Sequence, residues 1–303
     1  MKTERAPRNP ALAARLGSLL GNISYEVMPF KRTEDEVVAH VPLDIPVTIT
    51  VTEAKGISAT IDLAERLAAH GYHVNPHLPA RQIGSEAELV DIVNRMLANG
   101  IDRAFIVAGD AKEPAGDYDS ALKLIQALDH MGRPLSDIGV SGYPEGHAHI
   151  SDADLDTALR TKTPYAARIV TQMCFDATTI ARWADATAQR GITVPVIVGL
   201  PGPVSRQKLV RIAGGIGLGQ SARFLQKQQG LLRKFLTPGG FTPDGLLRKL
   251  AALPTASAGN IQGLRIFTFN EIAGTEEWRR NLAASLPGAL GEPCPPAQRV
   301  SAQ

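Results

Sequence analysis

Hydrophobic residues along this chain gather into short, nearly continuous runs, and the segments between them carry apolar residues at every third or fourth position. Such runs are typical of strands buried on both faces, and the intervening periodicity is typical of amphipathic helices. We expect eight strands, at residues 23–28, 47–52, 73–78, 103–109, 137–141, 168–175, 194–199 and 264–269. A helical segment is expected after each of them.

A repeated unit sets the order of these elements. At four places a helix is expected to end in glycine, with an apolar strand beginning a few residues later (Gly71, Gly100, Gly132 and Gly191). The intervals are 29, 32 and 59 residues (100 − 71, 132 − 100 and 191 − 132). The first two fit one helix–strand unit of a parallel sheet, and the third fits two units.

Eight strands alternating with helices predict an α/β fold, and their number favours a single-domain (β/α)8 TIM barrel. We place the barrel at residues 22–286, with an N-terminal extension at 1–21 and a disordered tail rich in proline, glycine and alanine at 287–303. The alternative is a doubly wound open sheet, which usually carries a G-x-G-x-x-G loop after its first strand. Residues 28–31 (Met-Pro-Phe-Lys) follow the first strand here and form no such loop.

Composition narrows the classes of partner. The formal net charge is only +2 over 303 residues, so nucleic acid is not an expected partner. No apolar run approaches the ~18 residues of a membrane-spanning helix, and the first residues lack the apolar core of a signal peptide. Two cysteines, Cys174 and Cys294, are too few for a disulfide framework. We therefore expect a cytoplasmic protein with no membrane partner, and a homo-oligomer is compatible with the sequence.

Polar residues stand at the carboxyl ends of the first six expected strands. These ends meet at one rim of a barrel, where the catalytic residues of such enzymes lie. The residues are Glu26, Thr52, Glu53, His77, Asp110, Tyr143, Glu145, His147 and Gln172. Glu26 is enclosed by apolar neighbours, and a buried, unpaired carboxylate is costly. We expect it to be paired, protonated or facing a cavity.

Two kinds of chemistry suit this set of residues. A metal-dependent hydrolase or lyase would use His147 and His149 of an H-x-H run, completed by Glu145, His77 or Asp110. Against this, barrel hydrolases usually carry such a pair at the end of the first strand, so we expect no metal. The other kind is a site for a flat, neutral ligand, held by amides, aromatic rings and one or two carboxylates, with Glu26 as a proton donor.

Several short motifs carry a resemblance to a known family. They are Tyr25-Glu26-Val27-Met28-Pro29, Pro76-His77-Leu78, Gly109-Asp110, Tyr143-Pro144-Glu145-Gly146-His147, Thr171-Gln172 with Phe175-Asp176, residues 199–205 (Gly-Leu-Pro-Gly-Pro-Val-Ser) and Thr268-Phe269-Asn270. In order and spacing, over residues 22–285, they resemble the catalytic barrel of the methylenetetrahydrofolate reductases. The Tyr-Pro-Glu-Gly-His run together with the glutamate of the first strand is the most specific part.

The resemblance implies an oxidoreductase that uses FAD and NAD(P)H to interconvert 5,10-methylenetetrahydrofolate and 5-methyltetrahydrofolate. It implies that Glu26 is the general acid that opens the folate ring, and that Asp110 stabilises the resulting iminium cation. Substrate contacts would come from Gln172, Thr52 and Gln207. Flavin contacts would come from His77, Gly109, Tyr143, His147, Arg160 and Lys162.

The chain departs from the family pattern mainly on the flavin side. Ala108 stands where an arginine often meets the flavin phosphates, and the basic residues of the fifth helix are reduced to Arg160 and Lys162. Gln207 replaces an aromatic residue that stacks on the substrates, and Thr52 lies in a changed Thr-Tyr-Gly motif. These changes leave three hypotheses open: FAD bound through altered contacts, direct hydride transfer between NAD(P)H and folate without FAD, and a non-catalytic folate- or flavin-binding module.

Overall fold

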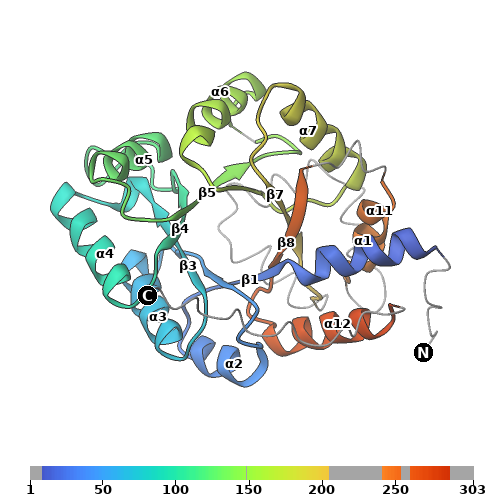
Figure 1. The fold of residues 1–303 in the computed structure, drawn as a ribbon. Coiled ribbons are helices and arrows are strands. Elements are labelled where there is room, and N and C mark those ends of the chain that lie inside the picture. Colours follow the sequence, from blue (N-terminus) through green and yellow to red (C-terminus); the bar gives the residue numbers. More distant parts are fainter. Residues whose placement is uncertain (1–8, 148, 205–240, 254–259, 287–303) are drawn as a thin grey trace, which may run out of the picture.

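The computed structural model describes residues 9–147, 149–204, 241–253 and 260–286. Eight parallel strands close into one barrel in sequence order, which confirms the predicted single-domain TIM barrel (Figure 1). The strands are β1 Ile23–Val27, β2 Val47–Ile49, β3 Val74–Pro79, β4 Arg103–Val107, β5 Asp137–Gly142, β6 Arg168–Thr171, β7 Val196–Pro201 and β8 Ile261–Phe267.

Helices surround the strands (Figure 1). They are α1 Pro10–Gly21, α2 Thr33–His40, α3 Gly56–Ala69, α4 Glu86–Ala98, α5 Ala121–His130, α6 Asp152–Lys162, α7 Ala177–Gln189, α11 Asp244–Ala251 and α12 Ile272–Ala284, with short 3-10 turns at Ala80–Gln82 and Thr163–Tyr165. The four glycines of the repeated unit lie just beyond the ends of α3, α4, α5 and α7, as the sequence predicts.

The strands alternate between helix-facing and barrel-facing side chains. Tyr25 points out of the barrel, because its hydroxyl donates a 2.7 Å hydrogen bond to Glu276 of α12. The next residue, Glu26, therefore points into the barrel. Its partners in the strand register are Thr48 on β2 and Phe267 on β8. This alternation brings one carboxylate into the interior near the end of β1.

Side chains cap several helices at the positions that the sequence indicates. Ser85 accepts a hydrogen bond from the Glu88 amide at the start of α4, and Asp176 accepts one from the Thr179 amide at the start of α7. Glu88 in turn accepts from the amide of Gly84, one residue before the cap. These bonds satisfy amides that have no partner within a helix, so they set where each helix begins.

Three strands differ from the predicted bounds by three residues or more at one end. The second strand ends at Ile49 and the sixth at Thr171, although apolar residues continue beyond both. The eighth strand begins at Ile261 and ends at Phe267, because Phe269 and Asn270 have φ angles of 50° and 58° that no strand adopts. Hydrophobicity alone therefore overestimates the length of β2 and β6, and it misses the first three residues of β8.

The helix α1 belongs to the packed core. It buries Leu16, Leu19 and Leu20, and the Arg15 guanidinium donates a 2.7 Å hydrogen bond to the carbonyl of Ile261 at the start of β8. In Figure 1 this helix runs across the region of β8. The contact places α1 at the amino-terminal end of the barrel, opposite the rim that holds the predicted site residues.

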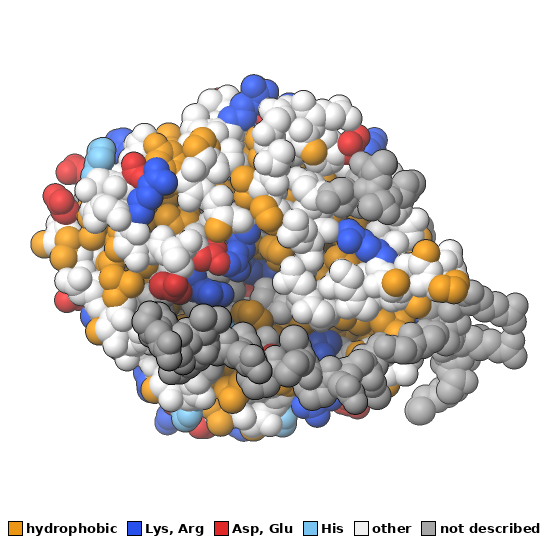
Figure 2. Space-filling model, in the orientation of Figure 1, with side chains coloured by type: hydrophobic (Ala, Val, Ile, Leu, Met, Phe, Trp, Pro, Cys, Tyr) orange, Lys and Arg blue, Asp and Glu red, His pale blue; other side chains and the backbone are white. Residues whose placement is uncertain are grey.

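Two segments addressed by the sequence analysis are only partly described. Between the seventh and eighth strands a helical segment is expected, and Asp244–Ala251 is helical. Residues 205–240 lie outside the described residues, as does the tail at 287–303. Among the helices that are described, none has the length and apolar character needed to cross a membrane. Figure 2 shows acidic and basic side chains interspersed on the face it draws, consistent with the small net charge.

Candidate active site

The carboxylate of Glu26 lies inside the barrel and faces two basic groups. His77 Nε2 on β3 is 3.4 Å from Glu26 Oε2, and Arg265 Nη1 on β8 is 3.8 Å from the same oxygen. Glu26 and His77 are 9% and 8% exposed. Glu26 was expected to be paired, protonated or facing a cavity, and in the structure it is paired.

Neither contact with Glu26 is a hydrogen bond. His77 Nε2, Arg265 Nε and Arg265 Nη1 are buried and have no hydrogen-bond partner among the described residues. Charge-assisted hydrogen bonds are shorter, at roughly 2.7–2.9 Å, so the Arg265 guanidinium acts on the carboxylate by charge, and neither basic group uses a carboxylate oxygen in a hydrogen bond.

Arg265 is the main site feature that sequence reasoning missed. Its side chain is almost completely buried, and its guanidinium carbon lies 4.6 Å from the ring centroid of Phe105, whose ring also packs against His77. Burial lowers the pKa of Arg265 to about 10, with Glu26 acting against this shift and Arg168 adding to it. The available signal was an arginine within an apolar strand, the same signal that identified Glu26.

The tip of β8 holds the end of β1 in place. The Glu26 carbonyl accepts hydrogen bonds from the Thr268 hydroxyl at 2.7 Å and the Thr268 amide at 3.2 Å. Asn270 accepts from the Met28 amide at 2.8 Å and donates to the Met28 carbonyl at 3.1 Å and to the Thr33 hydroxyl at 2.7 Å. The Thr-Phe-Asn motif therefore fixes the backbone that carries Glu26.

The loop after β5 is tied to the end of β6 by Glu145. Its Oε1 accepts hydrogen bonds from the amides of Phe175 and Asp176, at 2.8 and 3.0 Å, just before α7. Burial raises the pKa of Glu145, the two amides oppose this, and the nearby Asp176 adds to it. Glu145 thus joins two neighbouring loops at the rim.

Two aromatic rings stand beside each other in the same loop. The rings of Tyr143 and His147 meet edge to face with centroids 5.5 Å apart, and both residues are half-buried. Burial raises the pKa of Tyr143, a hydrogen bond with Ser141 opposes this, and the charge of Asp110 adds to it. Asp110, in the loop after β4, is therefore close enough to Tyr143 to act on it by charge.

Asp110 follows β4 and Gln172 follows β6, the two strands on either side of β5, and both residues are exposed. Gly109, before Asp110, has a φ of 88°, and a Cβ atom there would lie 2.9 Å from Cβ of Pro79. Only glycine lets this loop pack so closely on the end of β3. The backbone N–H of Gln172 donates a 2.8 Å hydrogen bond to the Gly142 carbonyl, which fixes the backbone of Gln172 against the end of β5.

The sequence model of the methylenetetrahydrofolate reductase family matches residues 22–217, well over half of the chain. The chain belongs to the methylenetetrahydrofolate reductase family. This confirms the resemblance drawn from the motifs, and it makes an enzyme of that family the expected identity of the barrel.

Two solved structures are similar over most of their length. One is a putative lyase/mutase from Burkholderia cenocepacia J2315, with 16% identity and a TM-score of 0.48, covering 90% of this chain and 86% of that one. The other is 2,3-dimethylmalate lyase, a PEP mutase/isocitrate lyase superfamily member, with 11% identity and a TM-score of 0.49, covering 92% and 88%. Likenesses at this level carry no argument about the site.

The reductase-family residues expected at the flavin diphosphate do not come together. Arg160 forms a 2.8 Å ion pair with Asp156 on the exposed side of α6. Lys162 is 7% exposed, and burial lowers its pKa to about 8. Side chains two positions apart on a helix do not face each other, which accounts for the separation.

The structure describes one of the two remaining residues expected to contact the substrate, Thr52, but not the other, Gln207. The hydroxyl oxygen of Thr52, after β2, is buried and has no hydrogen-bond partner among the described residues, so it is available to a ligand. Gln207 lies outside the described residues. Of the histidine, cysteine and acidic residues that the structure describes, no group of three or more could hold a metal ion.

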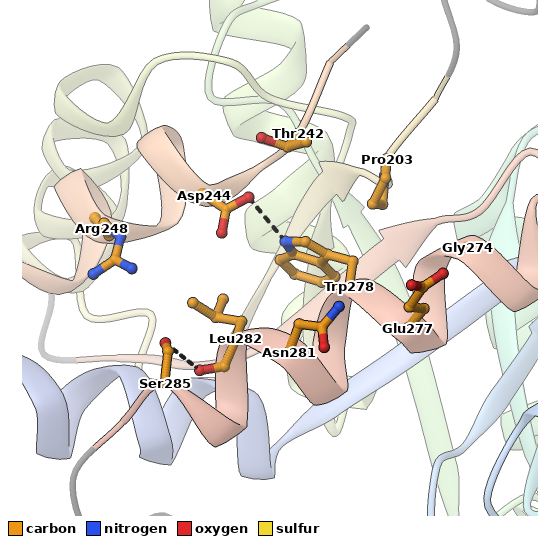
Figure 3. Close-up of a pocket in the computed structure, with 10 residues that line it drawn as sticks. All are labelled: Pro203, Thr242, Asp244, Arg248, Gly274, Glu277, Trp278, Asn281, Leu282 and Ser285. Carbon is orange, nitrogen blue, oxygen red and sulfur yellow. Dashed lines mark hydrogen bonds between the residues drawn. The ribbon is translucent and has the colours of Figure 1, made fainter. Parts of the chain in front are cut away.

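A cavity of about 540 Å³ lies apart from these residues, between α11 and α12 (Figure 3). Its lining includes Trp278, whose indole donates a 3.0 Å hydrogen bond to Asp244, and Pro203 from the loop after β7. None of the site residues expected for a reductase of this family lines it. The candidate active site is therefore the barrel rim around Glu26.

Proposed function

We propose that this member of the methylenetetrahydrofolate reductase family interconverts 5,10-methylenetetrahydrofolate and 5-methyltetrahydrofolate, with NAD(P)H as the hydride source. The observation that carries the proposal is the buried carboxylate of Glu26 at the end of β1, which faces His77 and Arg265 without a hydrogen bond to either. Such a carboxylate can exchange a proton with a bound substrate.

The reduction needs a proton and a hydride at different atoms of the folate. Protonation of the bridging nitrogen N10 breaks its bond to the methylene carbon and leaves an iminium cation at N5. Hydride addition to that carbon then forms the methyl group. Glu26 supplies the proton in this direction, and its carboxylate takes the proton back when 5-methyltetrahydrofolate is oxidised.

Asp110, in the loop after β4, and Gln172, in the loop after β6, bind the substrate. The negative charge of Asp110 stabilises the iminium cation, because a fixed charge aimed at a developing one lowers the barrier. Gln172 holds the pterin through its side-chain amide, which can donate and accept hydrogen bonds. Both side chains are exposed at the rim, where a ligand can reach them.

Family membership makes FAD the expected cofactor, and FAD would supply a relay for the hydride between NAD(P)H and folate. The ring side of its site fits the residues present, since Tyr143 and His147 offer aromatic faces and His77 offers a buried ring nitrogen without a hydrogen-bond partner among the described residues. Gly109 allows close approach by backbone. We propose that FAD is held chiefly through these ring contacts.

The second candidate is direct hydride transfer from NAD(P)H to the folate. One observation favours it: Arg160 is engaged with Asp156 and Lys162 is buried, so neither presents a cation to a diphosphate. In this version the nicotinamide would stack on the rings of Tyr143 and His147, and Glu26 would still be the proton donor.

An absorbance spectrum of the purified protein separates the two candidates. The protein is reconstituted with FAD, desalted, and treated with NADH and then NADPH without oxygen. A flavin band that bleaches supports the FAD-dependent form. Folate reduction by a protein that retains no flavin band supports direct transfer. A protein that binds methylenetetrahydrofolate but converts none, with or without FAD, would contradict both and leave a binding module.

A further inference from the structure

The buried guanidinium of Arg265 is paired with Glu26, but this ion pair contains no hydrogen bond that would offset the cost of its burial. A cation taken out of water is expensive unless it is paired and hydrogen-bonded. Arg265 is 1% exposed, its Nε and Nη1 atoms have no hydrogen-bond partner among the described residues, and its contact with Glu26 is 3.8 Å. A core stabilised by burial alone would be served by an apolar residue at this position.

The surroundings keep the guanidinium directed at Glu26. Arg265 pairs with Ser24 in the β1–β8 register, so Glu26 lies two residues further along β1 on the same inner face. The ring of Phe105 lies under the guanidinium and limits its movement, as a cation–π contact does. A nearby guanidinium, that of the partly buried Arg168, pairs with Asp137 instead.

We propose that Arg265 is a positioning residue that holds the Glu26 carboxylate at the substrate and sets the pH range in which Glu26 exchanges its proton. This inference rests on the proposed function and adds a residue to it. The basic groups facing the carboxylate are His77 from β3 and Arg265 from β8, and Thr48, the register neighbour on β2, is neutral. Arg168 acts on Arg265 through its charge.

The direction of the effect follows from the sign of the charge. A nearby cation favours the ionised form of a carboxylate, so removing it lets the carboxyl group keep its proton to higher pH. Reduction needs the protonated form of Glu26, and the rate of reduction therefore falls as the pH rises. Without Arg265 this falling limb moves to higher pH, and so does the rising limb of the reverse reaction.

The test compares the pH profiles of folate reduction by wild type, Arg265→Met, Arg265→Gln and Arg265→Lys. We expect the two neutral variants to move the falling limb up by about one pH unit or more, with a change in kcat larger than that in KM, and Arg265→Lys to keep most of the wild-type profile. NAD(P)H oxidation by a quinone acceptor should be unchanged in all of them. Arg168→Met is the control for loss of an interior cation and should keep the wild-type profile.

Three outcomes would overturn the proposal. The first is an unshifted profile in both neutral variants. The second is an equal loss of activity in all three Arg265 variants with a lowered melting temperature, which describes a packing role. The third is failure of both neutral variants to fold while Arg265→Lys folds, because the cation would then serve the fold. Absence of folate turnover in wild type would instead reject the proposed function itself.

Discussion

Asn270 gives the sharpest quantitative prediction, because its side chain joins the tip of β8 to the end of β1. Its three hydrogen bonds, to the Met28 amide, the Met28 carbonyl and the Thr33 hydroxyl, are 2.8, 3.1 and 2.7 Å long. At about 1 kcal/mol each, their loss costs about 3 kcal/mol, and less where water replaces them at this half-buried position. The left-handed φ of 58° adds about 1 kcal/mol for alanine but not for glycine.

The matched variants Asn270→Ala and Asn270→Gly separate these two contributions. Urea denaturation should give a free energy of unfolding lower by roughly 2–4 kcal/mol for Asn270→Ala, and Asn270→Gly should recover about 1 kcal/mol of that loss. Folate turnover should fall in both, because Thr268, two residues before Asn270 and hydrogen-bonded to its amide, holds the carbonyl of Glu26. Equal stabilities of the two variants, or values within about 0.5 kcal/mol of wild type, would refute this reasoning.

Three further predictions concern single side chains. Glu26→Gln should abolish folate reduction while NAD(P)H oxidation by a quinone continues, and unchanged folate turnover would remove Glu26 as the proton donor. Asp110→Asn should slow folate reduction by about 10²-fold, measured by stopped flow, and a wild-type rate would assign Asp110 a structural role. Lys162→Met should raise the free energy of unfolding by up to about 3 kcal/mol. The cost of burying charged Lys162 is present below pH 8 and fades as the pH rises towards 10.5, so a gain that does not fade with pH would contradict its electrostatic origin.

The barrel could be predicted from the sequence because its signal is repeated. Each helix–strand unit carries its own periodicity, and four of the units carry a terminal glycine as well, so an error in one unit leaves the count of eight intact. The ends of strands have no such repetition. At 168–175 the apolar run continues past Thr171, but the chain leaves the sheet there, and the amides of Phe175 and Asp176 bond to Glu145 instead.

A site residue could be predicted from the sequence only where its own residue type and its immediate neighbours indicate a function. A glutamate in an apolar strand has few structural explanations, so Glu26 could be identified, whereas the partners that face it depend on the register between β1 and β8. Arg265 carries the same signal, a charged residue within an apolar strand, but its position beside Glu26 follows only from that register. Arg160 and Lys162 show the opposite error, because proximity in sequence suggested a shared role that the geometry of a helix does not support.

Formation of 5-methyltetrahydrofolate by the purified protein decides whether this chain has the proposed activity. Purified protein is incubated without oxygen with 5,10-methylenetetrahydrofolate, FAD and NADH or NADPH, and the folates are separated and identified by mass spectrometry. We expect 5-methyltetrahydrofolate in amounts that match the nucleotide oxidised, with wild type but not with Glu26→Gln. If neither nucleotide is oxidised and the folate is recovered unchanged, the chain is not a reductase of methylenetetrahydrofolate.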